Sequence, residues 1–477
     1  MLPHDSVGYK KEPTNGEEPM SATPGPRAWA VLAVLSGAIF LEGIDVSMMG
    51  VALPSMRADL GLTTGELQWV VSAYVLGYGG FVLLGGRAAD LLGRRRMFLL
   101  WLTVFVAFSG MGGLAVDGWM LVTARFVTGV AAAFLTPAGL SIITTTFAEG
   151  PLRNKALLVY SGMGAGGFTL GMVAGGLLTA LGWRWVFFAP VLVAAVLLAA
   201  AIPLLPADGP RAGSGRFDVA GTATLTSGAV LLVLGIAHAP ETTVGVTALT
   251  LAGAVALLTA FVLVERRVAA PLVRLGILRS AALRRANTGA MLLLGSFMGF
   301  QFVAVLHLQE VLGWSTVQTG LALAVAGIDA VLAPTVTPLL VNRFGGPRVV
   351  VAGMVSAALG YALFLPLGST FGAVVPTFLA IGLAFTCAYG PLTIMATDGV
   401  EAHEQGLASG VLVTSQQFGT AIGLAVVTAV VVAVGGGVVT PEALRAGLVV
   451  SVVAAVVGIV VAATGVRRRV GAQPAAA

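Results

Sequence analysis

Long apolar stretches, separated by short polar connections, make up almost the whole chain. After a polar N-terminal segment, apolar stretches of about 20 residues, the length that crosses a lipid bilayer, recur fourteen times. Because a membrane interior offers no water to the backbone, each stretch is expected to form a helix. The expected spans cover residues 28–52, 67–86, 97–116, 120–147, 156–180, 184–205, 217–237, 244–264, 289–310, 318–340, 346–368, 373–397, 406–434 and 441–466.

Composition agrees with this pattern. Of the 477 residues, 57% are hydrophobic and only 10% are charged, and the mean hydropathy is +0.96, far above that of soluble proteins. We therefore predict an all-α polytopic membrane protein. The first span is too long for a signal-peptide core, so we expect it to be retained. The single cysteine, Cys387, rules out an intramolecular disulfide.

The basic residues indicate how the spans are oriented. If the N-terminus is cytoplasmic, 22 of the 26 Lys and Arg lie in loops and tails on that side, and three, Arg57, Arg184 and Arg445, lie on the other. The remaining one, Arg125, falls inside the fourth span. Basic loops stay in the cytoplasm, so both termini are expected there. The net charge of +5 then reflects membrane topology and predicts no nucleic-acid partner.

Two pairs of matching segments suggest an internal repeat. "DLLGRRR", 90–96, resembles "NRFGGPR", 342–348, which lies 252 residues later, and "YSGMGAG", 160–166, resembles "ASGVLVT", 408–414, 248 residues later. A duplicated six-helix unit with two additional spans would explain both offsets, and such repeats bind substrate between the two bundles near the membrane midplane. The expected division is a disordered cytoplasmic tail (1–26), an N-terminal six-helix bundle (27–206), an inserted helix pair (207–265), a cytoplasmic linker (266–285), a C-terminal six-helix bundle (286–466) and a cytoplasmic tail (467–477).

Acidic residues inside the spans are the first candidates for function. Glu42 and Asp45 lie three residues apart on one face of the first span. An ionised carboxylate at the bilayer centre costs about 3 kcal/mol or more, so such a residue usually faces a watery cavity or a partner. Two neighbouring carboxylates also resist double ionisation, which suits a proton carrier. The alternative for Asp45 is an ion pair with Arg125 that merely joins the first and fourth spans.

Two further acids lie in the second half of the chain. Asp329, about midway along the tenth span, could carry a second proton or meet a cationic substrate; the alternative is a protonated side chain bonded between helices. Glu310, near a helix end, is expected to be solvated.

Several motifs follow one another in a recognisable order. The stretch "GGRAADLLGRRR", 85–96, connects the second and third spans, "DVSMMGVALP", 45–54, lies in the first span, and "RFVTGVAAA", 125–133, lies in the fourth. "GWRWVFF", "FDVAG", "ERRVAAPLVRLGILRS" and "EQGLASGVLVTSQQFGTAIG" follow. Together they resemble the major facilitator superfamily, and within it the fourteen-helix drug:proton antiporter branch.

The resemblance implies a secondary active exporter that exchanges protons for hydrophobic or cationic drugs by alternating access. It implies proton coupling at Asp45, with Arg125 as its charge partner. The motif between the second and third spans implies a cytoplasmic gate formed by Gly86, Asp90, Gly93, Arg94 and Arg95. Its glycines would form tight turns, Asp90 would meet a helix N-terminus, and the arginines would pair with acids across the cytoplasmic gap.

Glycines recur at four-residue spacing in the fifth and thirteenth spans. In the fifth they coincide with the branch's antiporter motif, here Gly167, Gly171, Gly175 and Gly176, although Met172 stands where a proline is usual. Glycines at this spacing let helix backbones approach closely. Because the two spans are equivalent in the repeat, their glycine faces are expected to be where the halves meet and slide.

A binding site for varied amphipathic molecules needs aromatic area and a few polar groups. The expected lining residues are Phe40, Phe300, Phe302, Gln309, Gln416 and Gln417. The sequence contains no GxSxG, P-loop or HExxH motif and no Cys/His cluster. A formal GxGxxG at Gly162, Gly164 and Gly167 follows no expected strand, so we expect no nucleotide cofactor. The remaining alternatives are a proton-coupled transporter of one metabolite and a non-transporting receptor. We expect a monomer in a bacterial cytoplasmic membrane, whose partners are a small-molecule drug, protons and lipid.

Overall fold

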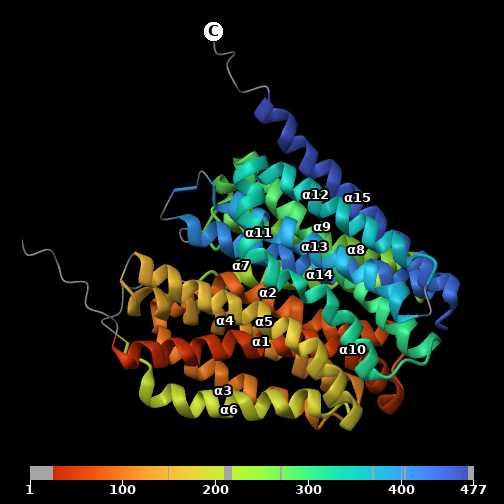
Figure 1. Cartoon of the computed structure of the whole chain (residues 1–477), viewed down its shortest axis with the longest axis horizontal. Coiled ribbons are helices and arrows are strands. Elements are labelled where there is room, and N and C mark those ends of the chain that lie inside the picture. The colour runs from red at the N-terminus through yellow and green to blue at the C-terminus, as the bar shows by residue number, and fades with distance from the viewer. Residues whose placement is uncertain are drawn as a thin grey trace, which may run out of the picture.

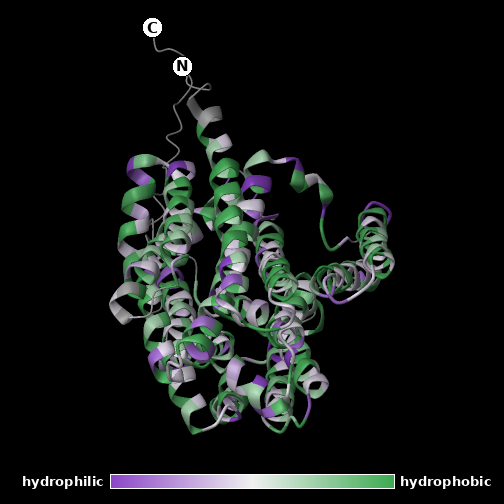
Figure 2. Ribbon diagram, turned by 90° about the vertical axis from the view of Figure 1, so that its right-hand side faces the viewer, coloured by the Kyte–Doolittle hydropathy of each residue, from purple (hydrophilic) through white to green (hydrophobic). Residues whose placement is uncertain are grey.

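The computed structural model describes residues 25–148, 150–208, 217–268, 271–367, 370–398, 400–401 and 404–470, and within these residues it contains helices and no strand. Fourteen helical segments are long and apolar enough to cross a membrane. The predicted fold class and number of spans are therefore confirmed. Figure 2 shows that hydrophobic residues predominate along the helices.

The helices are labelled in Figure 1. They are α1 (Pro26–Leu60), α2 (Thr64–Leu92), α3 (Arg94–Gly113), α4 (Gly118–Thr146), α5 (Pro151–Leu181), α6 (Trp185–Leu204), α7 (Val219–Ala237), α8 (Val244–Glu265), η1 (Leu275–Arg279), α9 (Ala281–Leu306), η2 (His307–Val311), α10 (Thr316–Ala324), η3 (Val325–Ile328), α11 (Asp329–Phe344), α12 (Gly346–Phe364), α13 (Phe371–Thr397), α14 (Gln405–Gly435) and α15 (Pro441–Val470). The ninth span consists of α9 and the π-helical turn η2. The tenth consists of α10, the 3₁₀ turn η3 and α11.

Helix packing repeats between the two halves of the chain. In the N-terminal half α1 packs on α5, α2 on α4, and α3 on α4 and α6; in the C-terminal half α9 packs on α14 and α15, and α12 on α13 and α15. The contact of α1 with α5 thus corresponds to that of α9 with α14, as the internal repeat predicts. The halves meet where α2 packs on α14 and α5 on α10, and α7 and α8 pack mainly on each other. Figure 1 shows the halves one above the other, α1 to α6 below α9 and α11 to α15.

Helix boundaries follow from local capping. α2 begins with a capping box in which Glu66 donates its backbone N–H to the Thr63 hydroxyl at 3.1 Å and its carboxylate accepts the Thr63 N–H at 2.8 Å. Ser315 and Gln318 form the same motif at the start of α10. α9 begins before the predicted bundle boundary at 286, and α15 continues to 470, into the segment expected to be a tail. Most of the other predicted tail, residues 1–24, lies outside the described residues.

Because successive spans alternate in direction, the chain has two well-defined sides. The side on which α1 begins is here called the terminal side, and the opposite one the far side. An even number of spans brings the end of α15 back to the terminal side. The loops after α1, α3 and α5 lie on the far side.

Candidate functional site

Asp45 of α1 and Arg125 of α4 form a buried ion pair. Arg125 Nη1 donates to Asp45 Oδ2 at 2.6 Å, and the side chains are 2% and 0% exposed. Arg125 Nε also donates to the Val70 carbonyl at 3.2 Å, and its guanidinium lies 4.4 Å from the centre of the Tyr74 ring. The predicted contact is confirmed. Asp45 Oδ1 has no hydrogen-bond donor within the described part of the chain, so it keeps an acceptor for a proton or water.

Glu42 lies one turn earlier on α1 and has different partners. The Thr136 hydroxyl of α4 donates to Glu42 Oε2 at 2.6 Å, and the Tyr78 side chain of α2 also bonds the carboxylate. Among the described residues no basic side chain pairs with Glu42. A small cavity beside it is lined by Leu41, Phe98, Leu102, Phe105, Leu135 and Tyr160. Glu42 is therefore a membrane carboxylate held by neutral hydroxyl groups.

Asp329 is the first residue of α11, immediately after the 3₁₀ turn that interrupts the tenth span. Its carboxylate lies by the backbone N–H groups of Asp329 itself and Ala330, which form the N-terminus of α11. Such a terminus carries a partial positive charge that favours an anion. Gly327 in the turn faces Thr169 of α5, where no side chain would fit. The turn thus places an acid next to the interface between the halves.

Tyr389 of α13 is a further candidate residue, which the sequence did not identify. It lies close enough to interact electrostatically with both Glu42 and Asp329, and the Gln416 side chain of α14 bonds its hydroxyl. Its side chain is 45% exposed, which is high for a tyrosine inside a helical bundle. Glu42 and Asp329, predicted separately from the two halves, thus each lie within electrostatic range of Tyr389, and these three residues are here called the central site.

A row of aromatic rings crosses the interface beside Tyr389. Phe168 of α5 lies 6.4 Å from Phe297 of α9, Phe297 lies 4.8 Å from Phe385 of α13, and Phe385 lies 6.3 Å from Tyr389, between ring centres. These four residues are here called the aromatic row. The sequence had singled out other phenylalanines in place of these. The four-residue spacing of Phe385 and Tyr389 on α13 was the only signal that the sequence offered.

Of the residues predicted to line the cavity, only some lie near the interface. Gln416 bonds Tyr389, and the Gln417 side chain lies against Gly79 of α2. Gln309 also lies at the interface, but on the far side, where it donates to the Val51 carbonyl of α1 at 2.9 Å. The Phe40 carbonyl lies against Gly167 within the N-terminal half.

The other two predicted phenylalanines lie in the core. Phe300 is fully buried against Tyr361, Phe364 and Phe378 of the C-terminal half. Phe302 is also buried. These two rings stabilise the C-terminal half and present no surface to the central site.

The glycine stripes join helices within each half. A Cβ atom at Gly167, Gly171 or Gly175 of α5 would collide with α1, at Gly167 with the Phe40 carbonyl. Gly419 and Gly423 of α14 face α9 in the same way. The expectation that these faces lie between the halves is wrong for those glycines. It holds for Gly176 alone among the four motif glycines of α5, because a Cβ there would come within 2.6 Å of the Thr316 carbonyl of α10.

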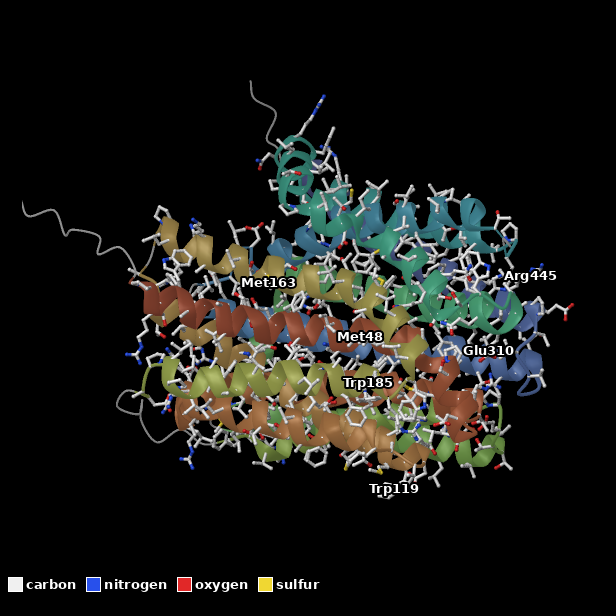
Figure 3. All side chains as sticks on the ribbon, turned by 60° about the horizontal axis from the view of Figure 1, so that its bottom comes forward. Met48, Trp119, Met163, Trp185, Glu310 and Arg445 are labelled. Atoms are coloured by element: carbon white, nitrogen blue, oxygen red, sulfur yellow. The ribbon has the colours of Figure 1, made fainter. Side chains whose placement is uncertain are left out.

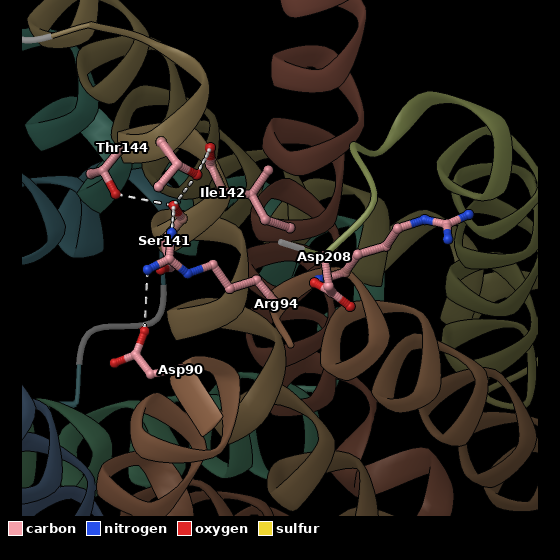
Figure 4. A network of polar contacts seen from close by, with 8 residues as sticks. Asp90, Arg94, Ser141, Ile142, Thr144 and Asp208 are labelled. Atoms are coloured by element: carbon pink, nitrogen blue, oxygen red, sulfur yellow. Dashed lines mark hydrogen bonds and ion pairs between the residues drawn. The ribbon is translucent and has the colours of Figure 1, made fainter. Parts of the chain in front are cut away.

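The motif between α2 and α3 forms a polar network within the N-terminal half (Figure 4). Arg94 Nη2 donates to Asp90 at 3.3 Å and its Nη1 to the Ser141 carbonyl of α4 at 3.4 Å, while Arg95 donates to the Ile202 carbonyl of α6 at 2.7 Å. Neither arginine reaches across to the C-terminal half through these bonds.

Two details of that motif differ from expectation. Asp208, which follows α6, caps α3 by accepting the backbone N–H groups of Arg95 at 2.8 Å and Arg96 at 3.2 Å, the role expected of Asp90. Gly86 lies inside α2 and forms no turn, whereas Gly93, with φ +105°, does. Nothing in the sequence near 90–96 pointed to a residue more than a hundred positions away.

On the far side, polar side chains of one half bond to the other half. Arg57 of α1 pairs with Glu310 of η2 at 2.9 Å, and the Thr316 hydroxyl donates to the Gly176 carbonyl at 2.9 Å. Glu310 is exposed, as expected, and its side chain remains 25% accessible in this pair. Figure 3 shows Glu310 towards the end of the molecule where Arg445 also lies, far from Met163. Together with the Gln309 bond, these contacts join the ninth and tenth spans to α1 and α5.

Comparison with known proteins shows the family. The model of the Major Facilitator Superfamily matches residues 35–424 and 288–475 of the chain. The chain belongs to the major facilitator superfamily. It is thus a multi-pass membrane transporter and not an enzyme, and its fourteen spans agree with the branch that the motifs indicated.

Several curated relatives carry names of resistance proteins, export proteins or transporters. The puromycin resistance protein of Streptomyces alboniger is 37% identical, over 85% of this chain and 82% of its own. The cephamycin export protein of Amycolatopsis lactamdurans is 36% identical, over 84% and 85%. A probable actinorhodin transporter of Streptomyces coelicolor is 32% identical, over 87% and 75%.

Solved structures show the same fold at low identity. A peptide transporter, PepTSo, superposes with a TM-score of 0.68 at 15% identity, covering 92% of this chain and 98% of its own. A bacterial homologue of the lysosomal transporter Spinster, in an inward-facing and unoccupied conformation, gives 0.66 at 16% identity, covering 95% and 100%.

Proposed function

We propose that this transporter is a proton-coupled antiporter that exports hydrophobic or cationic drugs or antibiotics. The names of its relatives, which include puromycin resistance and cephamycin export proteins, support this substrate class. The observation that carries the proposal is the central site. There, two acids without basic partners among the described residues, Glu42 and Asp329, each lie within electrostatic range of Tyr389.

The chemistry of the central site suits either a proton or a cationic substrate. A carboxylate in a membrane interior can be neutralised either by protonation or by a bound cation, so the two ligands compete for the same acids. The aromatic row offers flat apolar surface, and aromatic faces also attract cations. Proton binding would then favour substrate release and proton loss would favour capture. Such competition is what antiport requires, since each ligand must bind the two facing states differently.

Asp45 is assigned to the coupling mechanism together with Glu42 and Asp329, and Arg125 is assigned as its charge partner. The pair is buried, but Asp45 Oδ1 has no donor among the described residues. A proton arriving there would weaken the ion pair and loosen α1 from α4. The energy is sufficient: one proton crossing about 100 mV gives about 2.3 kcal/mol, and one pH unit adds about 1.4 kcal/mol. Together these support roughly a 500-fold concentration ratio for a neutral substrate.

We infer that the terminal side is cytoplasmic, because the basic residues gather there. The contacts that close the far side, Arg57 with Glu310 and Thr316 with Gly176, then form an outer gate. Gly86, Asp90, Gly93, Arg94 and Arg95 remain assigned to the cytoplasmic gate. The transporter is proposed to act as a monomer, because each chain carries both halves of the central site.

Proteoliposomes under an imposed pH gradient test the proposal. Puromycin or a cephamycin added to the wild type should cause proton release and should itself be transported. Glu42→Gln and Asp329→Asn should each reduce substrate-driven proton release at least tenfold. Asp117→Asn serves as a matched control, because this far-side acid only caps α4 and asparagine caps equally well.

The outcome that contradicts the proposal is substrate-driven proton release that persists in both central-site variants. Transport without any proton movement in the wild type would leave an exporter driven by another gradient, and would equally exclude antiport with protons. Substrate binding without transport in any variant or in the wild type would indicate a receptor.

A further inference from the structure

Two buried carboxylates outside the central site meet at the terminal ends of the inserted helix pair. Asp218 caps α7 and Glu265 is the last residue of α8, and they are only 3% and 5% exposed. Each uses one oxygen for a backbone N–H: Asp218 Oδ1 accepts from Gly221 at 2.7 Å, and Glu265 Oε2 accepts from Val273 at 3.0 Å. The transport proposal uses neither residue.

The second oxygen of each carboxylate points to the same place. A Cβ atom at Gly221 would lie 2.6 Å from Asp218 Oδ2 and 2.7 Å from Glu265 Oε1, so both oxygens lie over this glycine. Both are inaccessible to solvent, and neither has a hydrogen-bond partner of good geometry among the described residues, although the Leu272 backbone N–H also lies near the Glu265 carboxylate. Asp218 Oδ2 and Glu265 Oε1 are therefore close to each other and buried. If both groups were ionised, two unpaired anions would be buried side by side, at a cost of several kcal/mol each.

No charged side chain among the residues that the structure describes removes this repulsion. α7 and α8 contain no other charged residue. Arg274 of the linker between α8 and α9 pairs with Glu404 before α14, and Arg87 of α2 donates to the Pro271 carbonyl. Arg266 and Arg267, next in sequence to Glu265, are exposed. Among the described residues no basic side chain forms an ion pair with Asp218 or Glu265.

We propose that Asp218 and Glu265 bind one proton between them, and that this shared proton holds the linker onto the inserted helix pair. The proton forms an O–H···O⁻ hydrogen bond from one carboxyl to the other, a short and strong type of bond. Both groups then keep their backbone partners, including the N–H of Val273 in the linker. A metal ion fits less well, since no group of three or more acidic, histidine or cysteine side chains gathers within the described residues, and hard cations need more ligands.

This site differs from the central site in its consequence. The linker residue Pro271 is also bonded to α2, and Arg274 to the start of α14. The shared proton therefore secures a junction at which the inserted pair, the N-terminal half and the C-terminal half are all connected. On loss of the proton the two anions repel, Glu265 withdraws from Val273, and the linker is released on the terminal side.

Hydrogen–deuterium exchange of the Val273 amide in the full-length protein tests this proposal. The protection factor, which corrects for the intrinsic effect of pH on exchange, should fall about tenfold in the wild type between acidic and alkaline pH, as expected for losing a hydrogen bond to a charged acceptor. Asp218→Asn should abolish the pH dependence, because the new amide donates to Glu265 permanently. Glu265→Gln provides a second variant with the same expected result. Glu265→Ala should expose the amide at every pH.

Three results would overturn the proposal. The first is a wild-type protection factor that stays constant with pH. The second is a pH dependence that persists in both amide variants. The third is protection that follows the concentration of added sodium or magnesium at constant pH, which would assign a metal ion to the site. Each can occur whether or not the protein exchanges protons for drugs, so failure here is distinguishable from failure of the proposed function.

Discussion

The buried pair between Asp45 and Arg125 gives the sharpest test of how structure and coupling are related. Replacing Asp45 with asparagine leaves the Arg125 guanidinium, 2% exposed, without a counter-charge. At an effective dielectric constant of about 20, unit charges about 4 Å apart attract by about 4 kcal/mol. Removing one partner of a buried pair costs about 3–5 kcal/mol in measured cases. We therefore expect Asp45→Asn to destabilise the folded protein by about 3 kcal/mol or more.

The assay is thermal unfolding of the purified protein in detergent, followed by the proton-release measurement in proteoliposomes. Asp59→Asn is the matched control: its partner Arg184 lies 2.7 Å away, but the two side chains are 47% and 41% exposed. An exposed pair contributes about 1 kcal/mol or less. The control should therefore shift the unfolding temperature far less than Asp45→Asn.

A double variant separates stability from coupling. Asp45→Asn with Arg125→Gln removes both charges, and the uncharged pair should recover most of the lost stability. If Asp45 takes part in coupling, proton release should stay low in the double variant despite this recovery. Restored proton release would show that the pair only joins α1 to α4. An Asp45→Asn protein as stable as the Asp59→Asn control would refute the electrostatic reasoning itself.

Three further predictions concern other parts of the molecule. Gly175→Ala would bring a methyl group within 2.8 Å of the α1 backbone and should lower the unfolding temperature. Reversing the charges of Arg57 and Glu310 together should restore the far-side closure that either single reversal weakens, measured as the distance between spin labels on α1 and α9. Asp208→Ala should destabilise the protein by about 1 kcal/mol through loss of the α3 cap, measured by thermal unfolding.

Each of these has its own control. Gly166→Ala should not destabilise, because no atom lies within 4 Å of its Cβ position, and equal loss in both variants would contradict the packing argument. Failure of the double charge reversal to close the far side would remove Arg57 and Glu310 from the outer gate. Asp208→Asn should retain most of the stability, so an asparagine variant as weak as alanine would contradict the cap.

The spans and the buried ion pair were predictable from the sequence for clear reasons. Spanning a bilayer requires a minimum apolar length, so the number of spans follows from counting such stretches. Asp45 and Arg125 are opposite charges at similar depth in the first and fourth spans, and a charged residue inside a membrane usually pairs with another. Both predictions depend on position along the chain, which the sequence gives directly.

The orientation of each helix about its own axis was not predictable from the sequence. Phe297 and Phe300 are three residues apart on an equally apolar helix, yet only Phe297 joins the aromatic row. In a soluble helix the polar face would reveal which side is buried, but lipid removes that contrast. For the same reason the glycines of α5 predicted a close helix contact without indicating which helix it was. Asp208 was missed because a capping acid in a loop has no periodic signal.

The glycine seams joining α5 to α1, and α14 to α9, have a consequence for how such a transporter can diversify. Where two backbones touch, no side chain is available to vary, and every substitution adds bulk to a filled space. If the aromatic row contacts substrate as proposed, selection for new substrates is directed there, where one ring can be replaced by another side chain without moving a helix. The helix pairs that hold each half together are thus built on glycines that tolerate no larger side chain.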